Sequence, residues 1–269
     1  MVTYDTAHRG PRAVEELINL FKYRGLVFQL IRRNILTRYK RSVLGVAWTL
    51  INPLGTMVIL TLVFSNIFKT EGYAAYILSG LLVWNLFSQT TVACIVDLIW
   101  GSQLIHRIYV PRTAFAMAAI GTGLVNMMLA LIPLFAVILF TGIRLNWSIL
   151  FLPIPMVLIA CFSLGFGLII SAFAVFFPDV SEMYQIVLTA WMYLTPIIYP
   201  PEALNETLRL WIGRLNPMYG LVQLFRMPLY EGRVPTWDEF WPSLLLSLVI
   251  LVVGWLFFTR KSDEYSYRL

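Results

Sequence analysis

The sequence predicts an all-α integral membrane protein with six transmembrane helices, an N-terminal amphipathic interface helix and two short re-entrant outer helices between spans five and six. The first observation is composition: the 269 residues are 59% hydrophobic and only 13% charged, with a mean hydropathy of +0.76. Soluble domains carry about 25% charged residues and need polar side chains to cover their surface. The second observation is that six long stretches contain no Asp, Glu, Lys or Arg.

The six uncharged stretches reach or nearly reach the length of a membrane span, because crossing about 30 Å of hydrocarbon at about 1.5 Å per residue takes about 20 residues. They are residues 42–68, 73–96, 113–143, 145–178, 183–201 and 240–259. The fifth is the shortest, and Pro196, Pro200 and Pro201 should end it abruptly. We expect one membrane domain over residues 1–269, with the six-span bundle in 46–260.

The positions of the cations predict the orientation. Fourteen of the 20 Lys and Arg residues lie before residue 42, in 97–112 or after residue 259, and six lie in the remaining loops. Cytoplasmic loops carry the excess of positive charge, so both termini should be cytoplasmic.

Two further segments show helical periodicity without the length to span. Near the N-terminus, Val14, Leu17, Ile18 and Phe21 share one face, which indicates an amphipathic element on the inner membrane surface. Residues 202–230 hold a second apolar stripe, interrupted by "NPMYG", which favours two short helices dipping back from outside.

Several kinds of chemistry have no support in the sequence. There is no phosphate-loop motif for nucleotide hydrolysis and no nucleophile motif. The two histidines, His8 and His106, are far apart, so we expect no metal site and no cofactor on this chain. No carboxylate, Lys, Arg or His lies in the interior of a span, which disfavours a proton-driven carrier, although backbone carbonyls could still bind sodium. Energy for uphill transport should therefore come from another chain.

Eight aromatic residues lie deep in the predicted spans or at their ends, and they have two interpretations. They could pack against the protein or lipid, or they could line a pathway for sugars, whose apolar faces lie against aromatic rings. The candidates are Trp84, Phe87, Phe173, Phe176, Phe177, Tyr184, Trp191 and Tyr193.

The loop 98–112, "LIWGSQLIHRIYVPR", is more apolar than a loop that only turns in water requires. A short helix there would present apolar side chains beside two arginines, as an interface with a soluble partner does. The residues concerned are Leu104, Ile105, Arg107, Ile108, Tyr109, Pro111 and Arg112.

Five motifs occur in an order that is similar to one family. "RYKRSVLGVAWTLINP", "IYVPR", "FFPDV", "LTPIIYP" and "LNPMYG" resemble the permeases of type-2 ATP-binding-cassette polysaccharide exporters, which move lipid-linked O-antigen, capsule or teichoic-acid chains. The similarity runs from about residue 10 to the C-terminus. One departure is Pro178 before Asp179, where the family often has Arg, so a salt-bridging role there is in doubt.

The resemblance implies a homodimeric permease with two separate nucleotide-binding subunits, which would bind ATP and Mg. Within residues 10–45 it assigns 14–36 to the interface element and 37–45 to a gate with Leu44 and Gly45 at its turn. It makes 98–112 the ATPase coupling segment. It makes 202–230 the outer gate, where the candidate residues are Trp211, Asn216, Pro217 and Tyr219.

The leading hypothesis is export of an undecaprenyl-type pyrophosphate glycan from the inner to the outer leaflet of the bacterial cytoplasmic membrane. Cations beside the first span would attract the lipid's pyrophosphate at about 1 kcal/mol each, and a tyrosine would contact sugar. These residues are Arg32, Arg33, Arg38, Tyr39, Lys40 and Arg41. Anchoring on the cytoplasmic lipid surface explains the same cations equally well, and it explains them better than nucleic acid does.

Two alternatives remain. A type-2 exporter of a drug or small lipid would have an ATPase gene beside it without glycosyltransferase genes. A membrane-embedded transferase acting on lipid-linked sugars needs a catalytic carboxylate or histidine facing a cavity, and the spans offer none.

Overall fold

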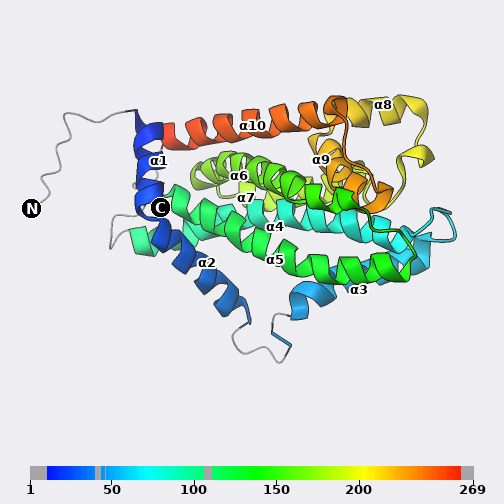
Figure 1. Cartoon of the computed structure of the whole chain (residues 1–269). Helices are drawn as coiled ribbons and strands as arrows, with labels where there is room; N and C mark the ends of the chain where they lie inside the picture. The colour runs from blue at the N-terminus through cyan, green and yellow to red at the C-terminus, as the bar shows by residue number, and fades with distance from the viewer. Residues whose placement is uncertain (1–10, 40–43, 46, 106–110, 262–269) are drawn as a thin grey trace, which may run out of the picture.

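The structure is a computed structural model that describes residues 11–39, 44–45, 47–105 and 111–261, and every regular element in these ranges is helical. Long helices form a bundle, α1 lies across one end of it, and α8 and α9 lie at the other (Figure 1). We call these ends the α1 end and the α8 end.

The α-helices are α1 (Arg12–Lys22), α2 (Arg24–Tyr39), α3 (Ala47–Phe64), α4 (Tyr73–Ile105), α5 (Thr113–Phe140), α6 (Pro153–Phe176), α7 (Val180–Leu194), α8 (Glu206–Leu215), α9 (Pro217–Arg226) and α10 (Trp237–Arg260). Shorter turns are the 3₁₀ helices η2 (Trp147–Phe151) and η3 (Pro201–Ala203) and the π-helix η4 (Met227–Glu231).

The multi-pass membrane class is confirmed. Five helical stretches in the described residues are long and apolar enough to cross a bilayer, and they correspond to the predicted spans one, two, three, four and six. They are α3, α4, α5, α10 and the stretch Trp147–Phe176, in which η2 leads into α6. Burial is deepest in α4 and α6 and least in α3, so α4 and α6 form the centre of the bundle.

The predicted fifth span, 183–201, differs from the expectation. It is the 15-residue helix α7, whose length of about 22 Å is shorter than the hydrocarbon layer of about 30 Å. Pro196 is the physical reason for the early end, because a proline restricts the residue before it and donates no backbone hydrogen bond. The chain then continues through a buried, non-helical turn at Thr195–Ile198.

The second span is longer than predicted. The sequence suggested a span over 73–96 followed by a separate short helix, but α4 continues without a break for 33 residues, from Tyr73 to Ile105. Asp97 therefore lies within a continuous helix rather than at its end. A carboxylate is tolerated there because it is hydrogen-bonded to a side chain of α2.

The N-terminal amphipathic segment is two helices, with the break at Tyr23. The carboxylate of Glu16 on α1 accepts hydrogen bonds from the backbone N–H and the hydroxyl of Thr113 at the start of α5, both at 3.4 Å. Burial raises the pKa of the Glu16 carboxyl above its ordinary value. The indole of Trp255 on α10 donates to the Ala13 carbonyl at 3.1 Å. These contacts attach α1 to the ends of α5 and α10.

Two glycines allow α6 and α10 to cross at close range. A Cβ added to Gly254 would lie 2.8 Å from the Cα of Gly165, and one added to Gly165 would lie 2.6 Å from the Cα of Leu251. Both neighbours are backbone atoms, which cannot turn aside as a flexible side chain can. Small residues at such crossings are how helices approach closely in a membrane.

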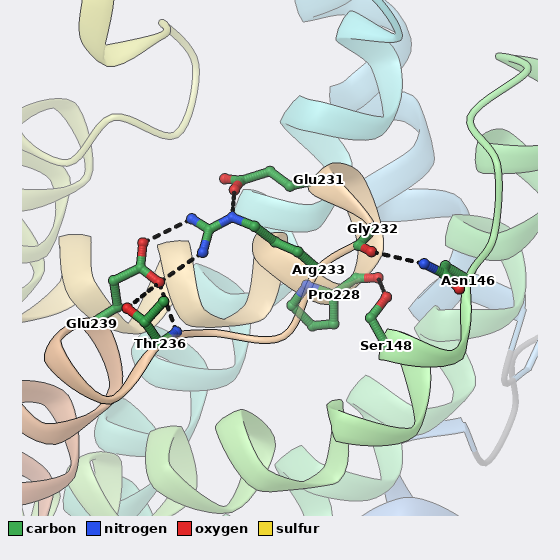
Figure 2. Close-up of polar contacts among 8 residues, drawn as sticks. All are labelled: Asn146, Ser148, Pro228, Glu231, Gly232, Arg233, Thr236 and Glu239. Carbon is green, nitrogen blue, oxygen red and sulfur yellow. Dashed lines mark hydrogen bonds and ion pairs between the residues drawn. The ribbon is translucent and has the colours of Figure 1, made fainter.

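Polar contacts fasten the connections at the α8 end (Figure 2). The guanidinium of Arg233 donates to both carboxylate oxygens of Glu239, at 2.7 and 2.8 Å, and to Glu231 at 2.7 Å. The amide of Asn146 donates to the Gly232 carbonyl at 3.1 Å. The turn between η4 and α10 is therefore held to the turn that precedes α6.

Candidate functional site

A cavity of about 260 Å³ lies between α3, α4 and α5, with Met192 of α7 at its wall. We call it the central cavity. Its polar lining consists of amides and hydroxyls on the spanning helices: Thr49, Asn52, Thr56, Asn85, Gln89 and Asn126. None of the described residues that line it carries a charge. A polar side chain within a hydrocarbon layer is costly unless it finds a partner, so the cavity should hold polar contents.

A second cavity, of about 340 Å³, lies between α2, α4 and α5. We call it the α2 cavity. Gln89, Gly123 and Asn126 line both cavities, which shows that the two adjoin. Asn34 and Thr37 contribute to the α2 cavity from α2. Together the cavities form a polar path from the amphipathic helix α2 into the layer of spanning helices.

Helical spacing explains how one face of each helix supplies this path. Asn85, Gln89 and Asp97 are separated by multiples of four residues and share one face of α4. Thr122 and Asn126 repeat the spacing on α5. These two polar stripes meet where the helices pack together, and the apolar faces of α4 and α5 are left for the core.

One hydrogen bond joins two side chains that line the polar path. The Asn34 amide donates to the Asp97 carboxylate at 3.2 Å, which holds α2 against α4. By contrast, the side chains of Asn85, Gln89 and Asn126 form no hydrogen bond with the rest of the described chain. Each amide can donate and accept hydrogen bonds, so the path can bind a hydroxyl-rich molecule.

The predicted headgroup residues Arg32 and Arg33 lie on α2 but are not among the described residues that line the polar path. Arg32 and Arg33 are exposed on α2, and the Arg33 guanidinium donates to the Asn34 side chain at 3.2 Å. Arg38 and Tyr39 lie in the last turn of α2, Lys40 and Arg41 lie outside the described residues, and Leu44 is exposed. Gly45 has a φ of 48°, a left-handed turn that glycine adopts without strain, directly before α3.

The eight predicted pathway aromatics do not form one surface. Trp84, Phe87, Tyr184 and Trp191 pack together between α4, α6 and α7, and the first three are buried. Phe87 is 0% exposed, so in this conformation it contacts only protein. The other four lie outside this cluster: Phe173, Phe177 and Tyr193 are exposed, and Phe176 is partly buried.

Asn216, one of the predicted outer-gate residues, connects three elements. Its side-chain oxygen accepts from the Trp191 indole at 2.9 Å and from the backbone N–H of Met218 at 3.1 Å, which caps α9. Its amide donates to the Thr195 hydroxyl at 2.9 Å. The end of α7 is thereby held to the junction of α8 and α9. The other three are placed as follows: Trp211 is exposed on α8, Pro217 begins α9, and Tyr219 is partly buried on α9.

The predicted coupling residues fall at the α1 end. Leu104 and Ile105 lie in the last turn of α4, as a continuation of the span rather than in a helix of their own. Pro111 is buried and Arg112 partly buried at the start of α5. The remaining three, Arg107, Ile108 and Tyr109, lie outside the described residues.

The arrangement defines a multi-pass membrane protein with an uncharged polar cavity among its spanning helices. Residues 25–230 match the ABC-2 type transporter family, and the chain belongs to this family.

The chain is 27% identical over 251 residues to the O-antigen export system permease protein RfbA of Myxococcus xanthus, covering 92% of this chain and 96% of that protein. It is 23% identical to RfbA of Klebsiella pneumoniae, covering 90% and 95% of the two chains. It is 24% identical to the capsule polysaccharide export inner-membrane protein CtrC of Neisseria meningitidis, covering 88% and 91%. The resemblance indicated by the five motifs is confirmed.

The amides of the polar path were not among the site residues predicted from the sequence. These amides are Asn52, Asn85, Gln89 and Asn126. The signal was present, because uncharged polar residues at helical spacing inside a span mark a face that avoids lipid.

Proposed function

We propose that this chain is the permease subunit of an exporter that moves a lipid-linked polysaccharide, an undecaprenyl-type pyrophosphate glycan, from the inner to the outer leaflet of the bacterial cytoplasmic membrane. The family and the names of the relatives support polysaccharide export. The observation that carries the proposal is the polar path, in which unpaired amides face two adjoining cavities.

Amides suit a moving glycan better than charged groups do. An amide can donate a hydrogen bond to a sugar hydroxyl or accept one from it, and each such bond contributes little to the binding energy. A charged lining would hold counter-ions and favour an ion-coupled mechanism. Among the described residues that line the polar path, Asp97 alone carries a charge, and it is already hydrogen-bonded to Asn34. In this proposal sugars pass along the amides while the lipid remains in the membrane.

Six crossings are part of the proposal, with α7 and the turn after it as the fifth. Non-helical backbone is tolerated at membrane depth only where protein satisfies its polar groups. The carbonyls of this turn have such partners. Arg226 donates to Pro196 at 2.7 Å and to Ile197 at 3.0 Å, and the Tyr73 hydroxyl donates to Ile198 at 2.6 Å. Both termini would then be cytoplasmic, with α8 and α9 as re-entrant helices outside.

The partners in this proposal are a second copy of the permease and two ATPase subunits, which supply ATP and Mg. The α1 end would face the ATPase, because the predicted coupling segment lies between α4 and α5 there. The apolar residues Val14, Ile18 and Phe21 on α1 are exposed and available to the membrane or a partner. The contact between Glu16 and Thr113 would pass a movement of the coupling segment to α1.

Replacing both Asn85 and Asn126 with leucine should lower the amount of surface polysaccharide about tenfold while leaving the permease in the membrane. Each lost hydrogen bond to sugar is worth about 0.5–1.5 kcal/mol, and about 1.4 kcal/mol corresponds to a tenfold change. The measurement compares surface polysaccharide by immunoblot in a deletion strain complemented with each variant. The exposed Asn66 outside the spans serves as the matched control, as Asn66→Leu. Undiminished polysaccharide in the double variant would show that export does not use the polar path.

Replacing Arg38, Lys40 and Arg41 with glutamine should weaken binding of the lipid pyrophosphate by about 100-fold, because each cation contributes about 1 kcal/mol at the membrane surface. We expect membrane insertion and co-purification with the ATPase to persist while surface polysaccharide falls. Lys22 and Arg24, changed together to glutamine, control for a general loss of positive charge. If the triple variant exports normally, these cations act only as topology signals.

A further inference from the structure

A further cavity lies at the α8 end, away from the polar path. It is a crevice of about 750 Å³ bounded by the loop between α3 and α4, by α8, α9 and η4, and by the start of α10. We call it the α8 crevice. Its volume is within the range of about 300–1,000 Å³ that small-molecule sites occupy.

We propose that the α8 crevice binds a sugar unit of the glycan chain as it leaves the permease. This inference rests on the proposed export of a glycan and adds a second binding site to it. The site is distinct from the polar path, because the described residues that line the two have no member in common.

The lining of the crevice supplies hydrogen-bonding groups that the rest of the described chain does not use. Lys69, Glu202, Arg209, Tyr219 and Gln223 line the crevice, and their side chains form no hydrogen bond with the described chain. The two cations only donate, the carboxylate only accepts, and the hydroxyl and the amide do both. A sugar ring carries several hydroxyl groups, each of which is a donor and an acceptor. A lining that contains both donors and acceptors can therefore bind it.

Two arginines in the wall of the crevice are held in place by other residues before any ligand arrives. Each of the three guanidinium nitrogens of Arg233 donates to a carboxylate oxygen of Glu231 or Glu239 (Figure 2). The Arg226 guanidinium lies 3.6 Å from the centre of the Tyr76 ring and donates to backbone carbonyls. A rigid wall lowers the entropy lost on binding.

The lining of the crevice also indicates the class of ligand. The rings of Tyr219 and Tyr230 give the crevice apolar surfaces against which the C–H face of a sugar can lie. The many polar groups of the lining disfavour a lipid tail. The α8 end is also opposite the end where α1 lies and α2 begins, so a chain entering beside the start of α2 would reach this crevice last (Figure 1).

The test uses the full-length permease in lipid nanodiscs. The probe is the surface polysaccharide of the source bacterium, released from its lipid by mild acid, and saturation-transfer NMR measures binding. The variants are Arg209→Gln and the double variant Tyr219→Phe with Gln223→Leu. Arg214→Gln is the matched control, because Arg214 is an exposed arginine on the same helix that does not line the crevice. Gel filtration confirms that each variant is folded.

We expect the affinity for the delipidated glycan to fall about tenfold in Arg209→Gln and in the double variant, and to stay unchanged in Arg214→Gln. Equal affinity in all four proteins, or no binding to the wild type, would overturn the inference. The proposed function is judged separately, by whether deletion of the permease gene removes the surface polysaccharide. If deletion removes it but the crevice variants bind normally, export stands and the α8 crevice is not a sugar site.

Discussion

Replacing Gly254 with alanine should leave little folded permease in the membrane. The added methyl group would lie 2.7 Å from the carbonyl carbon and 2.8 Å from the Cα of Gly165, so α6 and α10 would have to move apart. Overpacking a core costs about 1–3 kcal/mol when side chains can adjust, and it costs more here because the neighbours are backbone atoms. The measurement is the yield of monodisperse protein after detergent extraction, together with its thermal unfolding midpoint.

The matched control is Gly55→Ala on α3. Gly55 is also inside a spanning helix, but an added Cβ there would meet no atom within 4 Å. Alanine has the higher helix propensity, so this variant should be as stable as the wild type or slightly more stable. Equal yields of the Gly254→Ala and Gly55→Ala proteins would mean that α6 and α10 do not cross as closely as described.

Replacing Arg226 with methionine should destabilise the α8 end by about 4 kcal/mol. Arg226 is only 1% exposed, and its guanidinium donates to the carbonyls of Tyr76, Pro196 and Ile197 and to the hydroxyl of Ser79. Burial lowers the pKa of Arg226, yet arginine keeps its charge in proteins. Methionine fills much of the volume but leaves buried acceptors without a donor, which costs about 1–3 kcal/mol for each one.

Lysine at position 226 shows how much of the stability depends on the positive charge and how much on the planar shape of the guanidinium. Arg226→Lys keeps the positive charge but replaces a planar fork with a single ammonium group, so it should recover only part of the lost stability. The thermal unfolding midpoint of the purified protein measures both variants, with the exposed Arg214→Met as the control. A wild-type midpoint for Arg226→Met would show that the turn after α7 is held by other contacts.

Much of the fold followed from local patterns in the sequence. Uncharged stretches of about 20 residues predict spanning helices, since each such stretch satisfies its own backbone hydrogen bonds in lipid. The break between α8 and α9 at Asn216 followed from the sequence "NPMYG", because asparagine caps a helix and proline begins one. The length of α4 could not be predicted in this way, because a single Asp97 looks like the end of a span unless its partner Asn34 is known.

The candidate site was less predictable, because it depends on which faces of distant helices meet. Phe87 and Trp84 suggested a sugar pathway, but the structure places them in a buried cluster with Trp191. Asn85 and Asn126 line the central cavity but were not predicted as site residues. An aromatic ring is equally suited to a core or to a pathway, so its type alone does not decide between them.

The sequence by itself determined that this chain is a multi-pass membrane protein, which family it belongs to, and where five spanning helices lie. These properties depend on local composition and on motifs read along the chain. Only the tertiary structure decided that the amides of α3, α4 and α5 share a cavity, that Arg226 holds the turn after α7, and that Gly165 and Gly254 meet. The physical reason is that each of these contacts joins residues far apart in the chain, through packing that no local pattern specifies.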